Sequence, residues 1–385
     1  MALSSSRKAP LLAAVVTALL LGLAACSSSG PSSSGSSSPS ASSSSSTSSQ
    51  VAAAQTAATA VERGPTVINM TTPLKSKPAP GKTFVFFNCG FTVCTILGNA
   101  IEAAVQSAGW KFRQITFNSA DPATLVQAMQ QALRYHPSYV SLTGLPAASG
   151  WGTEIPAYQK AGVKIVAAFL GPTTTTSTVI ANVAGPAFDQ ELGVDLAQFF
   201  IADSGGKGQA LIETVTDEPS VLLTGEAFAN TVKAGCSGCS TTTLGNTQSQ
   251  VVANSVTSTV VADLRSHPSI NYLFIPAAGV VPGVPSALAS VGLADKVKYL
   301  AAEAAASDLD VLKSGKAAAM IGNPLRYTGY LIVDAALRSS EGMTVDPSPT
   351  PPVQLVTPNS TFAAADTFDV PANFVSEFAT LWHTS

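Results

Sequence analysis

Short apolar runs alternate with amphipathic stretches from Lys82 to the C-terminus, and this alternation predicts an α/β fold with parallel sheets. Thr83 to Phe87 is β-branched and aromatic at consecutive positions, which suits a strand buried on both faces. The loop Asn88 to Cys94 follows, and apolar residues then recur at helical spacing until Gly109. Ligands of open α/β sheets bind beyond the carboxyl ends of the strands. We therefore expect the 88–94 loop to border a binding site.

The same alternation continues along the chain and then restarts after a glycine-rich break near 204–206. The first half predicts strands at 112–117, 138–142, 163–169 and 179–183, and helices from 121, over 155–161 and over 188–200. The second half predicts strands at 209–215, 241–244, 272–275, 297–300, 317–321 and 353–356, and helices at 220–234, 251–266, 284–291, 308–313, 327–337 and 373–382. Under the right-handed crossover rule these units form two doubly wound parallel-sheet lobes.

Length and charge limit the class of protein. A chain of 385 residues is long enough for two lobes that each bury a core. Only 11% of the residues are charged, against about a quarter in an average protein, and the net charge is −3. No basic surface for nucleic acid is indicated.

The N-terminus has the pattern of an export signal. Arg7 and Lys8 precede an apolar run, Leu11 to Ala25, which is shorter than the roughly 20 residues of a membrane-spanning helix. The sequence Leu23-Ala24-Ala25-Cys26 resembles the bacterial lipobox, in which the cysteine is lipidated. We expect residues 1–25 to be a lipoprotein signal peptide and Cys26 to carry acyl chains that hold the protein on the membrane. An ordinary secretory signal with a chance cysteine is the alternative.

Residues 26–81 have the composition of a tether. Ser27 to about Gln50 is almost pure serine, which buries nothing and behaves as a flexible chain. Val51 to Gly81 adds alanine, threonine and several prolines. We expect disorder or irregular structure throughout, with Thr66 to Met70 laid against the domain as an edge.

Four cysteines remain when Cys26 is set aside. An even number in an exported chain indicates disulfides, and pairing Cys89 with Cys94 and Cys236 with Cys239 gives the shortest loops. Cys236 and Cys239 also match a thioredoxin-like redox pair or half a zinc site. However, the motif follows a predicted helix end rather than opening a helix, and the three histidines, His136, His267 and His383, lack ligand spacing. The structural disulfides are favoured, and no metal or cofactor is expected.

Five fragments, in order and spacing, resemble the type I periplasmic-binding-protein family, specifically the sugar-type substrate-binding proteins of ABC transporters. They are Ala103 to Trp110, Asp121-Pro122, Gly205 to Gly208, His267 to Ile270, and Leu312 to Lys316 running to Gly322-Asn323-Pro324. The resemblance implies two lobes joined by a three-crossover hinge near Asn182-Val183, Asn323 and Leu355. It also implies an N-terminal lobe of 82–182 and 324–354, and a C-terminal lobe of 183–323 and 355–385.

The resemblance also implies where a ligand is held. Sugar receptors of this family use stacked aromatic rings together with Asp, Asn, Arg and Gln side chains. Position by position, this chain departs from that set: Phe169-Leu170 replaces an Asp-Arg pair, Ala277-Ala278 replaces Asn-Asp, and Thr224 replaces an arginine. The ligand-binding candidates are Phe91, Val93, Thr143, Phe169, Thr224, Gln250, Glu303 and Asn323. A cleft that has lost charged and amide groups indicates a solute less polar than a simple sugar, because hydroxyl groups buried without partners cost about 1–3 kcal/mol each.

These features favour a monomeric, lipid-anchored receptor on the extracellular face of the membrane that passes a small molecule to ABC permease subunits. A ligand sensor for a signalling partner, a receptor for an ordinary sugar, and a surface enzyme or adhesin are the alternatives. No G-x-S-x-G, P-loop or H-E-x-x-H motif is present, so no catalytic residue is proposed. A LacI-type repressor shares the fold, but the export signal argues against it.

Overall fold

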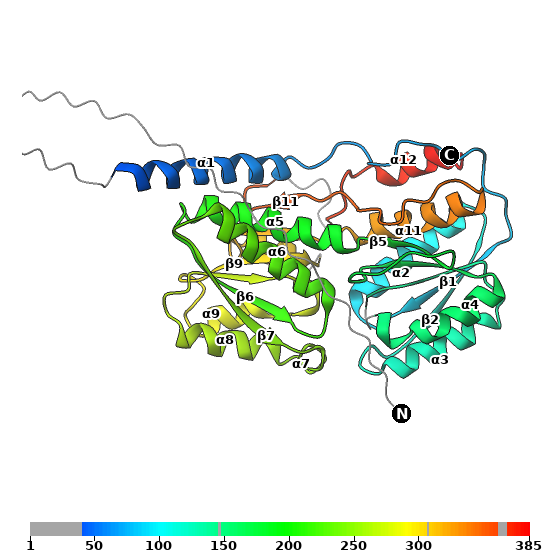
Figure 1. Cartoon of the computed structure of the whole chain (residues 1–385), viewed down its shortest axis with the longest axis horizontal. Helices are drawn as coiled ribbons and strands as arrows, with labels where there is room; N and C mark the ends of the chain where they lie inside the picture. The colour runs from blue at the N-terminus through cyan, green and yellow to red at the C-terminus, as the bar shows by residue number, and fades with distance from the viewer. Residues whose placement is uncertain (1–40, 145–147, 306–307, 361–367) are drawn as a thin grey trace, which may run out of the picture. The chain divides into compact units, whose positions relative to one another are not determined.

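The computed structural model describes residues 41–144, 148–305, 308–360 and 368–385, and most of its elements are arranged in two α/β lobes (Figure 1). The predicted signal peptide, Cys26 and the serine-rich residues up to 40 lie outside the described residues. In the described part of the chain, no helix is both long enough and apolar enough to cross a membrane.

The N-terminal lobe is built on a five-stranded parallel sheet with the order β2-β1-β3-β4-β5. Its strands are β1 (Thr83–Asn88), β2 (Lys111–Thr116), β3 (Tyr139–Leu142), β4 (Lys164–Ala168) and β5 (Val179–Val183). Its helices are α2 (Thr92–Ser107), α3 (Pro122–Leu133), α4 (Ile155–Ala161), α11 (Leu325–Ser340) and α12 (Phe374–Leu381), with short 3-10 turns η1 (Ala148–Gly150) and η2 (Gly152–Glu154).

Strand β1 is buried on both faces, as its sequence predicts. Phe84 and Phe86 point into the core formed with α2 and α11, whereas Val85 and Phe87 point into the core formed with α3 and α4. All four side chains are fully buried. The central strand is therefore covered by helices on both sides, which is the layer order of a doubly wound lobe.

The C-terminal lobe has a six-stranded sheet with the order β11-β10-β9-β8-β6-β7, parallel except for the antiparallel edge strand β11. Its strands are β6 (Gln209–Val215), β7 (Ser240–Asn246), β8 (Tyr272–Ile275), β9 (Lys298–Ala304), β10 (Ala319–Gly322) and β11 (Leu355–Val356). Its helices are α5 (Pro186–Asp203), α6 (Pro219–Gly235), α7 (Gln248–Val252), α8 (Val256–Ser266), α9 (Val284–Ser290), α10 (Asp308–Lys313) and the 3-10 turn η3 (Ala278–Val280). Helices α5 and α6 cover one face, and α8 and α9 cover the other.

The single helix predicted over 251–266 is two helices. Asn254 has a left-handed backbone (φ 54°), which ends α7, and α8 begins two residues later. Thr247 and Gln250 form a capping box at the start of α7, so this short helix begins and ends on local signals.

The C-terminal helix was predicted in the wrong lobe. Phe374 and Phe378 of α12, and Trp382 at its C-terminal end, belong to the N-terminal core, where they pack on Tyr327 and Tyr330 of α11. A buried ion pair in α11 strengthens this contact: Arg338 bonds Asp334, and the Asp334 carboxylate accepts a hydrogen bond of 2.9 Å from Trp382 Nε1. The apolar stripe of α12 shows that the helix is buried but not which sheet it covers.

The tether prediction was wrong for residues 41–62, which form helix α1 (Ala41–Glu62). Alanine has the highest helix propensity, and Ala54 and Ala58 are buried, with Ala54 in the C-terminal core beside α5. The side-chain amide of Gln354 donates a hydrogen bond from Nε2 to the backbone carbonyl of Glu62, at 2.7 Å. Thr66 to Met70 forms no strand, although Ile68 is buried in the N-terminal core.

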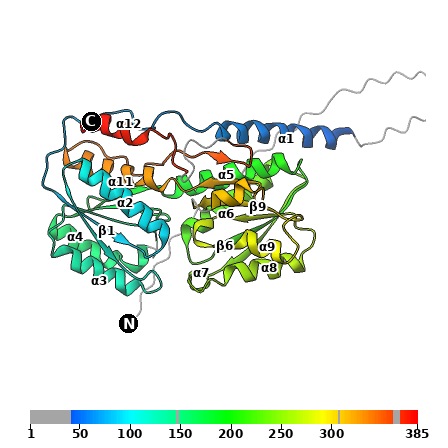
Figure 2. The ribbon, with the colours of Figure 1, turned by 180° about the vertical axis from the view of Figure 1, so that it is seen from behind.

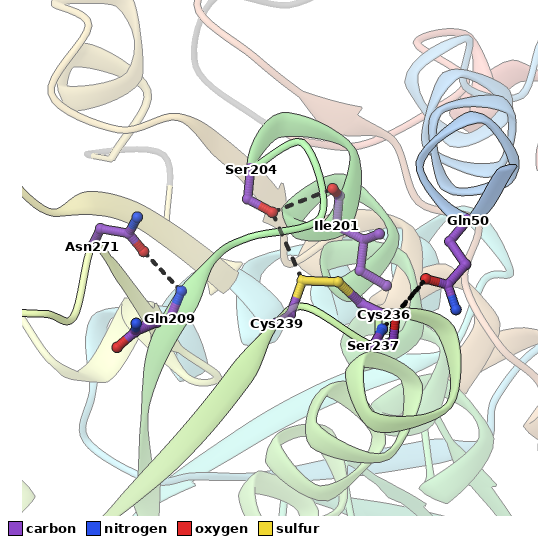
Figure 3. The surroundings of a disulfide bond; sticks show 8 residues. All are labelled: Gln50, Ile201, Ser204, Gln209, Cys236, Ser237, Cys239 and Asn271. Atoms are coloured by element: carbon purple, nitrogen blue, oxygen red, sulfur yellow. Dashed lines mark hydrogen bonds between the residues drawn. A yellow bond between two sulfur atoms is a disulfide. The ribbon is translucent and has the colours of Figure 1, made fainter. Parts of the chain in front are cut away.

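Both predicted disulfides are confirmed. Cys89 pairs with Cys94, and Cys236 pairs with Cys239, with Cα–Cα distances of 5.8 and 5.4 Å. The second disulfide lies next to α1: Gln50 Oε1 accepts hydrogen bonds of 3.3 Å from both the backbone nitrogen and the hydroxyl of Ser237 (Figure 3). Helix α1 is thus attached to the outer side of the C-terminal lobe (Figure 2).

The chain passes between the lobes at the three predicted positions: between β5 and α5, between β10 and α11, and before β11. Two more passages occur in the described part of the chain. The N-terminal segment runs from Ala54 in the C-terminal core to Ile68 in the N-terminal core, and the last segment runs from Phe368 to Phe374 in the same direction. The chain therefore crosses between the lobes more often than the sequence predicts.

Candidate functional site

A cavity of about 660 Å³, including its part open to solvent, lies between the two lobes. The space within it that the centre of a water-sized probe can reach is about 80 Å³. From the N-terminal lobe it is lined by Val93, Cys94, Leu97, Thr143, Gly144 and Phe169, and from the C-terminal lobe by Val215, Glu218, Ser220, Val221, Gln248, Ala277, Val280 and Glu303. Asn323 and Leu325, where the chain crosses between lobes, complete the lining.

The fold explains why these residues meet. Val93 and Cys94 open α2 after β1, Thr143 follows β3, Phe169 follows β4, and Val215 ends β6. Because the strands of each sheet are parallel, their carboxyl ends share one edge, and the residues beyond that edge converge. The loop from Asn88 to Cys94 thus borders the cavity, as expected.

Five of the eight ligand-binding candidates line the cavity: Val93, Thr143, Phe169, Glu303 and Asn323. The other three are not part of the lining. Phe91 packs against the α3 and α4 side of the N-terminal core. The Thr224 hydroxyl donates to Ser220 within its own helix, and the Gln250 side chain accepts from the backbone nitrogen of Thr247.

Two of the lining residues have a strained backbone. Phe169 (φ 57°) and Glu303 (φ 46°) adopt the left-handed conformation that non-glycine residues rarely take. Ala184 (φ 51°), at the first passage between the lobes, does the same. Such conformations cost about 1–3 kcal/mol each and concentrate at functional sites. The strain at Phe169 and Glu303 therefore marks the cavity as more than a packing defect.

Acidic groups are concentrated on the C-terminal wall. Glu218 is 5% exposed, Asp189 of α5 is fully buried behind it, and Glu303 is partly buried. Burial raises the pKa of Asp189 to about 9, and the charges of Glu303 and Glu218 add to this rise. Burial raises the pKa of Glu218 to about 8 and that of Glu303 to about 7.

The passage residues also carry polar groups. The backbone N–H of Asn323 donates a hydrogen bond of 3.1 Å to the carbonyl of Ala304. The side-chain Oδ1 of Asn323 is buried and has no hydrogen-bond partner among the described residues. Asn182 holds the backbone of Leu170 through two bonds, accepting from the nitrogen and donating to the oxygen. Asn182 therefore fixes the turn that presents Phe169.

Sequence comparison decides the family. A model described as a periplasmic binding protein domain matches residues 84–343, which is most of the chain and both lobes. This chain belongs to the periplasmic binding protein family. No curated protein sequence matches the chain.

Solved structures similar to this binding protein confirm its fold. GanP, a glucose-galactose binding protein from Geobacillus stearothermophilus, superposes with a TM-score of 0.63 at 16% identity, over 73% of this chain and 98% of that one. A solute-binding protein from Burkholderia graminis in complex with D-arabinose gives 0.63 at 16%, over 76% and 99%. One from Agrobacterium vitis with bound allitol gives 0.63 at 17%, over 72% and 96%. The type I periplasmic-binding-protein fold that the sequence resembles is thus the fold observed.

The most important residue of this binding protein that the sequence reading missed is Glu218. It is the N-cap of α6, and Pro219 occupies the first helical position. The same acid-proline signal correctly marks the start of α3, where Asp121 accepts from the nitrogen of Ala123 at 3.1 Å. The pair Glu218-Pro219 comes shortly after strand β6 and carries the same signal, which places Glu218 at the carboxyl edge of the sheet.

The lobes of the binding protein approach each other at two contacts. A Cβ at Gly171 would lie 2.5 Å from Cβ of Pro219, and a Cβ at Gly279 would lie 3.4 Å from Cγ1 of Val93. Glycine at 171 permits this close approach, whereas the short contact of a Cβ at 279 would be with the carbonyl oxygen of Glu303, at 2.9 Å within the same lobe. Among the described residues, no three His, Cys, Asp or Glu side chains are grouped so that they could hold a metal ion.

Proposed function

We propose that this binding protein is a solute receptor that captures a small molecule between its lobes, closes around it and delivers it unchanged to an ABC importer. The cavity that draws its lining from both lobes is the observation that carries the proposal. A ligand that contacts both lobes when they are closed, and only one when they are open, shifts the equilibrium toward the closed form by its differential affinity. No bond chemistry is required.

The same proposal extends to the class of ligand and to the location of the protein. Valine, leucine and alanine side chains provide much of the lining, which supports a solute less polar than a simple sugar. Acyl chains on Cys26 would keep a monomeric receptor on the extracellular face of the membrane, near its permease. A sensor that reports to a signalling partner would use the same closure, so the partner, not the cavity, distinguishes the two.

A solute screen on the full chain tests the receptor function. Thermal unfolding is followed with individual sugars, polyols, amines and aromatic metabolites, because a ligand bound only by the native state raises the midpoint. We expect at least one compound to bind and to be recovered unchanged by mass spectrometry. Chemical conversion of the bound compound, or binding of a simple hexose with no response to less polar solutes, would contradict the proposal in its function or its ligand class respectively.

A further inference from the structure

The cavity between the lobes combines apolar walls with carboxyl groups that lack a counter-charge. Glu218 and Glu303 line it, and no Lys, Arg or His is among the described residues that do so. Glu218 is only 5% exposed, and its Oε1 has no hydrogen-bond partner in the described structure. Both carboxylate oxygens of Asp189, which is fully buried, also lack a partner there.

This arrangement is costly for the protein without a ligand. A carboxylate removed from water needs hydrogen bonds or an opposite charge, and otherwise it takes up a proton. The three groups also repel one another, because Glu218 and Glu303 act on Asp189, and Glu303 and the exposed Asp217 act on Glu218. A hydrogen bond with Ser220 opposes this effect only at Glu218. In the ligand-free site, protons therefore supply the missing positive charge.

We propose that the cavity selects a small organic cation, an ammonium group carried on an apolar body, whose charge faces the carboxylates of Glu218 and Glu303. This inference rests on the proposed receptor function and names its ligand class. The valine and leucine side chains that line the cavity would cover the apolar body, and a cation over the ring of Phe169 would gain a cation–π contact. A neutral sugar would leave the two carboxyl groups without a charge partner.

The proton balance gives the inference a signature. A cation binds the carboxylate form, so it must displace the protons that Glu218 and Glu303 hold when the site is empty. A quaternary ammonium ion does not titrate, and its affinity should therefore rise as the pH is raised from about 6 to about 9, through the range in which these two groups ionise. A neutral ligand should show no such rise.

The test uses isothermal titration calorimetry on the full chain with quaternary ammonium ions as probes: choline, tetramethylammonium and phenyltrimethylammonium. 3,3-Dimethylbutan-1-ol is the matched neutral compound, because it replaces the nitrogen of choline by carbon. We expect at least one cation to bind, the neutral compound to bind about tenfold more weakly or not at all, and the cation affinity to increase with pH.

Substitutions locate the charge. Glu218→Gln and Glu303→Gln should each weaken cation binding by about tenfold or more and flatten its pH dependence. Glu213→Gln is the matched control, because Glu213 is equally buried and has a raised pKa but accepts from Asn246 and does not line the cavity. It should leave cation affinity unchanged. Glu303, being partly exposed, gives an independent result if Glu218→Gln fails to fold.

Each other result counts against the inference. Equal affinity for choline and its neutral counterpart, or wild-type cation binding by both glutamine variants, would overturn it. Binding of neutral sugars or polyols without any cation would also overturn it, while leaving the receptor function intact. If no cation binds at millimolar concentration, the ligand class is wrong, and the solute screen described above decides the receptor function separately.

Discussion

At the scale of single residues, the buried acids of this chain differ in whether their charge is balanced. Asp334 is buried together with Arg338 and Trp382, so its charge is balanced and its oxygens are bonded. Asp189 is equally inaccessible, but neither of its oxygens has a hydrogen-bond partner in the described part of the chain. The first carboxyl group holds the fold together, whereas the second weakens it whenever it ionises.

Asp189 should make the stability of the ligand-free protein fall as pH rises. Its pKa is about 9 in the fold against an ordinary value of 3.8, so between about pH 4 and 9 the native state holds a proton that the unfolded state has lost. Stability then decreases by up to about 1.4 kcal/mol per pH unit from this one group. Asp189→Asn, which mimics the protonated acid, should gain stability relative to wild type at about pH 8–9 and little at about pH 5.

Chemical denaturation across this pH range measures the difference. Parallel curves for wild type and Asp189→Asn would show that the Asp189 carboxyl group ionises with an ordinary pKa in the native state, contrary to what its burial indicates. A ligand-free preparation is essential, because a bound cation would stabilise the ionised group and mask the slope.

At the scale of elements, apolar periodicity predicted nearly every strand and helix of both lobes, because burial on a sheet or along a helix stripe is written into local sequence. It failed where one residue or a distant partner decides. The break between α7 and α8 depends on the left-handed backbone of Asn254, and the lobe to which α12 belongs depends on Tyr327 and Tyr330 of α11. The buried face of α1 consists of alanine, which looks like linker composition.

The candidate site divides in the same way. Thr143, Phe169 and Asn323 follow the ends of strands, so their place at the carboxyl edge of a sheet could be predicted from the strand boundaries alone. Thr224 and Gln250 were chosen by correspondence with a family pattern, but each is used by its own helix. That Glu218 and Glu303 line the same cavity follows from the positions of strands β6 and β9 in the sheet, and hydrophobic periodicity does not predict this strand order.

The two disulfides offer a matched comparison between elements. Both close very short loops, so loss of either, as Cys89→Ser with Cys94→Ser or Cys236→Ser with Cys239→Ser, should cost about 2 kcal/mol by loop-closure entropy. Only the first lies at the cavity, where Cys94 opens α2. Hydrogen exchange should therefore show lost protection around 90–97 in the first double variant and none there in the second. Similar exchange at 90–97 in both would mean that the disulfide does not order this loop.

At the scale of the whole molecule, capture requires the lobes to close over the cavity while the chain crosses between them repeatedly. The backbone N–H groups of Asn182 and Ala184 donate hydrogen bonds to the carbonyl oxygens of Pro347 and Pro349. The segment that leads to the third passage therefore runs beside the first passage. Motion must therefore be absorbed at short segments that share one side of the cavity. Gly171 follows Leu170, whose backbone is held by Asn182, so the contact of Gly171 with Pro219 lies close to the first passage.

Gly171→Val should hold the lobes apart. A Cβ at this position would lie 2.5 Å from Cβ of Pro219, which is too close for non-bonded carbon atoms, and the rigid proline ring cannot turn aside. The cheapest response is a small rotation about the passages, which would open the cavity and weaken ligand capture while each lobe keeps its core. Small-angle X-ray scattering should show a larger radius of gyration than wild type when a saturating ligand from the screen is present.

Gly152→Ala is the matched control, because a Cβ there meets no atom within 4 Å, and it should close like the wild type. If Gly171→Val closes equally well and binds with wild-type affinity, the contact at Pro219 is not part of the closed state, and the lobes must meet around the ligand in another way.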